Sequence, residues 1–126
     1  LVAESDRSRA EAIVPVLDAF APGLVIVSAG YDAHQRDPLA GMRMSTEGFA
    51  ALVAHLRGVA SRHASGRLLL VTEGGYDLPA LADGLEVSLE VLCEAAAPLA
   101  ISGDATRGRE ALEIVRAVQR PYWPAI

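Results

Sequence analysis

The apolar residues of the chain follow two different patterns. Residues 6–20, 49–59, 81–92 and 111–118 carry apolar side chains three or four positions apart. That spacing predicts four amphipathic helices. Residues 24–28 and 67–72 are instead short, continuous apolar runs rich in Val, Ile and Leu, which is typical of buried strands. The predicted order is therefore helix, strand, helix, strand, helix, helix.

Local signals set the expected limits of the first two helices. Pro15 lies in the middle of the first, so we expect a kink there or the start of a second helix. Ser45 or Thr46 is suited to cap the second, which should end near residues 65–66.

The last two helices are expected in the second half of the chain. Asp77 should cap the third helix, with Pro79 in its first turn. The apolar face of this helix is expected to consist of Leu81, Leu85, Leu89 and Leu92. A loop over residues 95–108 should then lead to the fourth helix.

Strands that alternate with helices predict a parallel sheet with right-handed crossovers. Both apolar runs are continuous, so we expect each strand to be covered on both faces. Two strands are too few for a stable sheet by themselves. The expected fold class is therefore α/β, with a parallel sheet between layers of helices, and the chain should be part of a larger domain.

Composition narrows the classes of function. The net charge is −5 and the arginines are scattered among carboxylates, so nucleic-acid binding is not expected. The single cysteine, Cys93, has no disulfide partner and is expected to be an inert, buried helical thiol. We see no apolar run of membrane-spanning length and no signal-peptide pattern. A cytoplasmic protein is the expectation.

Two polar clusters follow the predicted strands. The first is Ser-Ala-Gly-Tyr-Asp-Ala-His-Gln-Arg-Asp-Pro-Leu at residues 28–39, within a predicted loop that runs to residue 44. The second is Glu-Gly-Gly-Tyr-Asp-Leu at residues 73–78. Ligands of open parallel sheets bind beyond the carboxyl ends of the strands. Asp37 and Tyr76 are therefore expected to face one site.

Asp37 and Tyr76 each have a functional and a structural interpretation. Asp37 precedes Pro38 on a stiff loop, where its carboxylate is suited to be a zinc ligand or to close an Asx turn. Tyr76 follows two glycines, where its phenol is suited to donate to a developing oxyanion or to pack over the turn. A phosphate-binding loop is less suitable, because no Lys-Ser/Thr pair follows these glycines.

Together these motifs resemble the histone deacetylase superfamily, in particular its class II-like bacterial members and the related acetylpolyamine amidohydrolases. The resemblance extends from residue 22 to residue 44, through Ser-Thr-Glu-Gly-Phe and Leu-Leu-Val-Thr-Glu-Gly-Gly-Tyr-Asp-Leu, to Arg-Ala-Val-Gln-Arg-Pro-Tyr-Trp-Pro. It implies an arginase/deacetylase-like three-layer α/β fold, present here as a partial domain. Residues 1–126 would be the carboxyl-terminal portion of one catalytic domain, and a homo-oligomer is possible.

The resemblance also implies roles for individual residues. Asp37 matches the zinc ligand of the Asp-Pro-Leu motif, and Tyr76 matches the tyrosine that stabilises the oxyanion. Met44 matches an apolar position in the substrate tunnel, and Gly74 and Gly75 match the turn under the tyrosine. The implied activity is zinc-dependent hydrolysis of acetyl-lysine or acetylpolyamine amides.

The family's paired histidines and Asp-x-His zinc ligands have no match here, so the chain alone is expected to be inactive. His34 is interpreted as a variable loop position, and His55 and His63 as surface or helix-terminal imidazoles. Asp32, Glu73 and Asp77 are expected to serve as loop hydrogen-bonding groups and caps. The alternative function is a non-catalytic α/β binding or interaction module that retained the family's loops.

Overall fold

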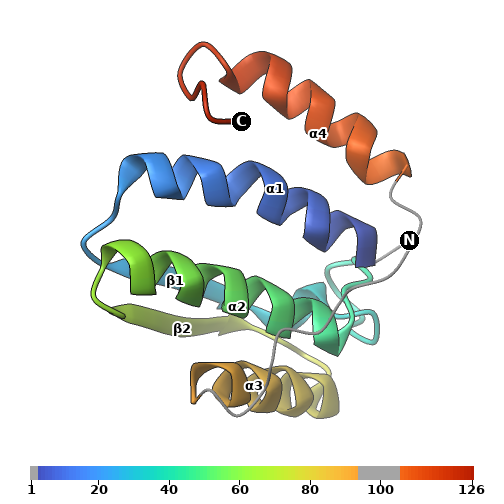
Figure 1. The fold of residues 1–126 in the computed structure, drawn as a ribbon. Coiled ribbons are helices and arrows are strands. Elements are labelled where there is room, and N and C mark those ends of the chain that lie inside the picture. The colour runs from blue at the N-terminus through green and yellow to red at the C-terminus, as the bar shows by residue number, and fades with distance from the viewer. Residues whose placement is uncertain (1–2, 94–105) are drawn as a thin grey trace.

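The computed structural model describes residues 3–93 and 106–126. Two parallel strands and four α-helices form this part of the chain, as predicted. In chain order the elements are α1 (Ala3–Phe20), β1 (Val25–Gly30), a 3-10 turn η1 (Tyr31–Ala33), α2 (Thr46–His63), β2 (Leu68–Gly74), α3 (Leu78–Leu92) and α4 (Thr106–Gln119) (Figure 1).

Both strands extend further toward the polar clusters than the apolar runs predicted. The parallel register pairs Val25 with Leu68 and continues to Ala29 with Thr72. Gly30 then pairs with Gly74, so Glu73 is one extra residue in β2. Such a bulge bends a strand and redirects the side chains that follow it. The two polar clusters therefore begin inside the sheet, side by side.

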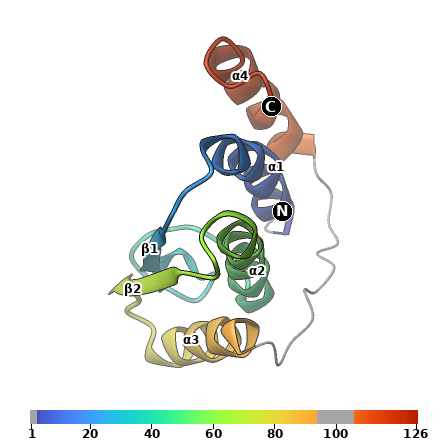
Figure 2. The same cartoon turned by 60° about the vertical axis from the view of Figure 1, so that its left-hand side comes forward.

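The sheet has one covered face and one bare face. Val25 and Leu68 pack with α1 and α2, and Leu70 packs with α2 and α3. Figure 2 shows α2 beside the strands, with α1 above it and α3 below it. On the other face, Ile26 is 63% exposed and Leu69 is 52% exposed. The prediction of strands buried on both faces is thus wrong for the described part of the chain, which has no element over that side.

Helix α1 is one continuous helix with Pro15 inside it, so no second helix begins there. It is joined to α2 through Asp18, whose carboxylate accepts hydrogen bonds from Arg62 at 2.7 and 2.9 Å. His63 lies 2.9 Å from the same carboxylate, at the end of α2 where a helix-terminal role was expected.

The expected caps form. Ser45, rather than Thr46, caps α2 by accepting the Gly48 N–H at 3.2 Å. The chain turns after α2 through Ser65 and Gly66, both at positive φ. Asp77 caps α3 by accepting the Ala80 N–H at 2.8 Å.

Helix α3 packs three of the four predicted leucines, Leu81, Leu85 and Leu92, against the core, but its most deeply buried positions are other residues. Its buried positions are Ala80, Gly84, Ser88 and Val91, while Leu89 is 59% exposed. The Tyr31 ring lies directly against Gly84, and its hydroxyl donates to the buried Ser88 at 2.9 Å. A large side chain at these positions would displace that ring, because packed interiors leave little free space.

The end of the chain also differs from expectation. Helix α4 begins at Thr106, so the last residues of the predicted 95–108 loop are helical, and the rest of that loop lies outside the described residues. Cys93 is exposed just after α3, not buried within a helix. None of the helices in the described ranges is long and apolar enough to cross a membrane.

We expect the isolated chain to self-associate through the bare sheet face, because large exposed apolar patches and free strand edges promote association. Sedimentation velocity should show dimers or larger species at micromolar concentration. Replacing Ile26 and Leu69 with lysine should shift the chain toward monomer. Ser61→Lys, on the exposed side of α2, is the control and should leave association unchanged. A single sharp monomer peak for the unmodified chain would contradict this prediction.

Two glycine-to-alanine substitutions in helices should have opposite effects. A Cβ at Gly84 would lie 2.5 Å from the Tyr31 ring, so Gly84→Ala should destabilise the fold by about 1–3 kcal/mol. A Cβ at Gly58 would meet only the flexible end of Arg62, at 3.2 Å. Gly58→Ala should therefore be neutral or stabilising by up to about 1 kcal/mol. Urea unfolding of both variants checks this, and equal effects would contradict it.

Candidate active site

The site forms where the loop after β1 meets the turn after β2. Asp37 comes from the first segment, and the residue is 7% exposed. Tyr76 lies in the second segment, 39 residues further along the chain. The Tyr76 backbone N–H donates to Asp37 Oδ2 at 2.7 Å. The structure therefore brings together the two residues that the sequence singled out.

Asp37 accepts hydrogen bonds from both segments. Oδ2 also accepts the Asp77 N–H at 3.3 Å, while Oδ1 accepts the N–H of Leu39 at 2.9 Å. The Leu39 contact is the Asx turn of the structural interpretation. Asp37 thus closes its own turn and, with the other oxygen, fixes the turn that carries Tyr76.

These contacts determine the charge of Asp37. Burial by itself raises the pKa of the carboxyl group. Hydrogen bonds from the backbone N–H groups of Leu39, Tyr76, Asp77 and Ala40 stabilise the charged form and together lower the pKa below its usual value. Asp37 is therefore ionised near neutral pH, and an ionised carboxylate is the form that binds a metal ion.

The Tyr76 side chain is 60% exposed, although its own N–H is held by Asp37. The Tyr76 backbone is therefore fixed while its side chain remains largely exposed. The structural interpretation required a ring packed over the turn, and this exposure does not fit it. Arg36 reinforces the region from the neighbouring loop, with its guanidinium 2.6 Å from Asp83 and 3.7 Å from Asp77. Asp77 caps α3, and Asp83 lies within that helix.

Gly74 and Gly75 are needed for two different reasons. A Cβ at Gly74 would lie 2.8 Å from the Asp32 carboxylate, which also lies against Gly30. Gly75 has φ +140, a conformation that residues with a side chain rarely adopt. Gly30 and Gly74 let the two strand ends close around Asp32. That carboxylate therefore packs against the strand ends beside the site.

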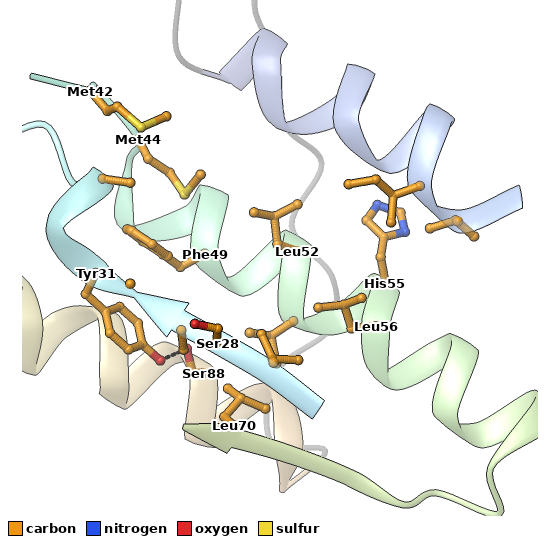
Figure 3. A pocket seen from close by; sticks show the side chains of 17 residues that line it. Ser28, Tyr31, Met42, Met44, Phe49, Leu52, His55, Leu56, Leu70 and Ser88 are labelled. Atoms are coloured by element: carbon orange, nitrogen blue, oxygen red, sulfur yellow. Dashed lines mark hydrogen bonds between the residues drawn. The ribbon is translucent and has the colours of Figure 1, made fainter. Parts of the chain in front are cut away.

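Met44 is placed in the core, with 5% of its surface exposed. It packs with Tyr31 and Phe49, and it lines an apolar cavity of about 340 Å³ between α1, β1 and α2 (Figure 3). Neither Asp37 nor Tyr76 is among the described residues that line this cavity. The role of Met44 in a substrate tunnel stays a prediction.

The sequence did not reveal the position of His34, which was interpreted as a variable loop residue. It is 2% exposed, and both ring nitrogens have partners. Nδ1 accepts the Arg36 N–H at 3.1 Å, and Nε2 lies 3.2 Å from the Thr46 hydroxyl. The only hint in the sequence that His34 could matter is its place three residues before Asp37. That spacing does not predict burial.

A complete metal site does not form from the described residues. Within 3–93 and 106–126, no group of three His, Cys, Asp or Glu side chains is arranged to hold a metal ion. A zinc site needs at least three protein ligands. Asp37 has suitable chemistry, as an ionised oxygen donor on a fixed loop, but the described residues do not complete a donor set around it.

The parallel sheet, the helical layer and the loop site define a partial α/β domain. A model of the histone deacetylase domain matches residues 3–92. The chain therefore belongs to the histone deacetylase family.

Individual relatives agree with this assignment. The histone deacetylase-like amidohydrolase of Pseudomonas aeruginosa is 47% identical over 64 residues, which are 51% of this chain and 17% of that protein. The human polyamine deacetylase HDAC10 is 36% identical over 117 residues, which are 90% of this chain and 17% of that protein. The crystal structure of the HDA15 HD domain has a TM-score of 0.80 at 26% identity, and covers 98% of this chain and 33% of that one. The chain thus spans about a sixth of the length of these curated relatives.

The low pKa of Asp37 predicts how stability changes with pH. The folded pKa lies below the unfolded value of about 3.9, so the contribution of Asp37 is fully present above that value. It is lost as the pH falls through the folded pKa. Asp37→Asn should therefore lower the free energy of unfolding at pH 6, and the difference from the unmodified chain should shrink below about pH 4. Urea unfolding at several pH values tests this, and a constant difference would contradict it.

Proposed function

We propose that residues 1–126 are the carboxyl-terminal portion of one deacetylase catalytic domain. The whole domain would be a zinc-dependent amide hydrolase that removes acetyl or short acyl groups from lysine side chains or polyamines. Membership of the histone deacetylase family supports this, as do relatives named as an amidohydrolase and a polyamine deacetylase. The rest of the domain would supply the other zinc ligands and the general base.

One observation carries the proposal: Asp37 Oδ2 accepts the N–H of Tyr76 at 2.7 Å. This hydrogen bond fixes the distance between a carboxylate and the backbone of a tyrosine that come from different strand ends. A reaction needs its participating groups held in a defined arrangement before the substrate arrives. The contact supports a shared role for both residues in one site.

Asp37 would be one zinc ligand. Its N–H donors keep it ionised and prevent its rotation, which favours metal binding over protonation. Bound zinc would supply an activated water and a polarised substrate carbonyl. Since the described residues offer no complete donor set, we propose that this chain by itself neither retains zinc nor hydrolyses amides.

Tyr76 would donate a hydrogen bond to the oxygen of the substrate carbonyl as negative charge develops there. A donor is effective in this role when its position is fixed beforehand. The Asp37 contact fixes its backbone, while the exposed phenol is free to reach a substrate. Met44 would line the passage for the acyl chain, and Gly74 and Gly75 would let the substrate approach the turn.

Tyr76→Phe in the full-length protein should lower kcat by about 10²–10³-fold, because it removes one oxyanion donor. Zinc content should not change, since the phenol is not a proposed ligand. Tyr122→Phe is the matched control, because Tyr122 is an exposed residue near the end of the chain. Deacetylation of an acetyl-lysine peptide and of an acetylated polyamine, with zinc measured by mass spectrometry, gives both readouts.

Asp37→Ala should instead remove zinc from the full-length protein and abolish activity with it. Asp18→Ala, at the contact between α1 and α2, is a carboxylate control that should retain zinc. If Tyr76→Phe and Asp37→Ala both kept normal zinc content and activity, the proposal would be wrong. The residues encoded before Leu1 provide a second test, since a catalytic domain requires a histidine pair and an Asp-x-His motif there.

A further inference from the structure

We propose that His34 is a positioning residue that sets the direction of the Asp37 carboxylate. The inference rests on the proposed function of Asp37 and adds a residue to that site. His34 would not contact substrate or metal. It would act by holding the turn of residues 34–37 in a single conformation.

The first argument is the burial of the ring. His34 is 2% exposed, and its ring is stacked with that of Phe49 at a centroid distance of 6.3 Å and an interplanar angle of 13°. A buried polar group must form hydrogen bonds to avoid a large desolvation cost. Both ring nitrogens of His34 meet this condition within the protein.

The hydrogen bonds define the tautomer. Nδ1 accepts the backbone N–H of Arg36 at 3.1 Å, so this nitrogen carries no proton. The proton of the neutral ring is then on Nε2, which lies 3.2 Å from Thr46 Oγ1 and donates to it. Thr46 is the first residue of α2, so the ring connects the loop to the beginning of a regular helix.

The backbone carries this constraint to Asp37. The His34 carbonyl accepts the Asp37 N–H at 2.9 Å, so the ring and the main chain of His34 close the same turn. On the other side, His34 forms a parallel bridge with Met44, and the Gln35 N–H donates to the Met44 carbonyl. The turn that ends at Asp37 is therefore fixed by His34 and by the Met44 segment. The Asp37 carboxylate accepts the Tyr76 N–H from this fixed position.

The two ring nitrogens suggest substitutions that separate their effects. The side-chain oxygen of asparagine takes the place of Nδ1 and can still accept the Arg36 N–H. The side-chain amide of glutamine takes the place of Nε2 and can still donate to Thr46. Phenylalanine keeps a ring against Phe49 and offers neither bond. A residue that only filled space would be replaced best by phenylalanine.

The experiment measures kcat/KM and zinc affinity of the full-length protein with each substitution. His34→Phe should lower both by about 10- to 100-fold, the usual effect of losing a group that orients a metal ligand. His34→Asn should retain most of both, because it preserves the turn of residues 34–37. His34→Gln should fall between them. His55→Asn and His55→Gln, at an exposed histidine, are the controls.

A second readout does not depend on zinc. In the metal-free protein, hydrogen exchange at the amides of Leu39 and Tyr76, which donate to Asp37, should be faster in His34→Phe than in His34→Asn. Equal exchange, zinc affinity and kcat/KM in the asparagine and glutamine variants would overturn the proposal, even if His34→Phe failed to fold. So would a His34→Phe variant that loses only thermal stability.

The outcomes also distinguish this inference from the proposed function. If Asp37→Ala retains zinc and activity, the proposed function is wrong, whatever the His34 variants do. If Asp37→Ala loses zinc while His34→Phe behaves like unmodified protein, only the positioning role is wrong.

Discussion

The Asp37 carboxylate is the interaction on which the site depends. It accepts N–H groups from its own loop and from the turn before α3, 39 residues away. Backbone N–H groups removed from water need an acceptor, and few side chains other than a carboxylate can serve several at once. Without it, the Leu39, Tyr76 and Asp77 amides would lose their shared partner. The loop after β1 and the turn after β2 are therefore one structural unit.

This dependence explains why the structural and functional interpretations of Asp37 are compatible. The N–H donors that close the Asx turn also lower its pKa and keep it ionised. The hydrogen bond that fixes the second turn also determines the position of the Tyr76 backbone, from which the phenol extends. A carboxylate held in this way has a defined charge and a defined direction, and both are requirements for a metal ligand.

The surroundings of the site show a domain that is only partly present in this chain. Helices cover one face of the sheet, while Ile26 and Leu69 on the other face are more than half exposed. The described residues form no group of three that could hold a metal ion. The chain also spans only 17% of two curated relatives. We propose one explanation for both the bare face and the incomplete donor set, which is that the rest of the domain supplies the remaining layer and ligands.

The sequence by itself determined the order of the elements, the parallel sheet, the Asp77 cap and the choice of Ser45 or Thr46 as the other cap, and it placed Asp37 and Tyr76 after neighbouring strands. Periodicity and caps depend on residues three or four positions apart, so they are visible in the chain. Only the tertiary structure decided the bare sheet face, the small-residue stripe around Gly84 and the burial of His34. Each depends on residues that are distant in sequence or on elements that the described residues do not include. The Tyr31 ring, for example, leaves no room for a side chain at position 84, and no local pattern encodes that contact.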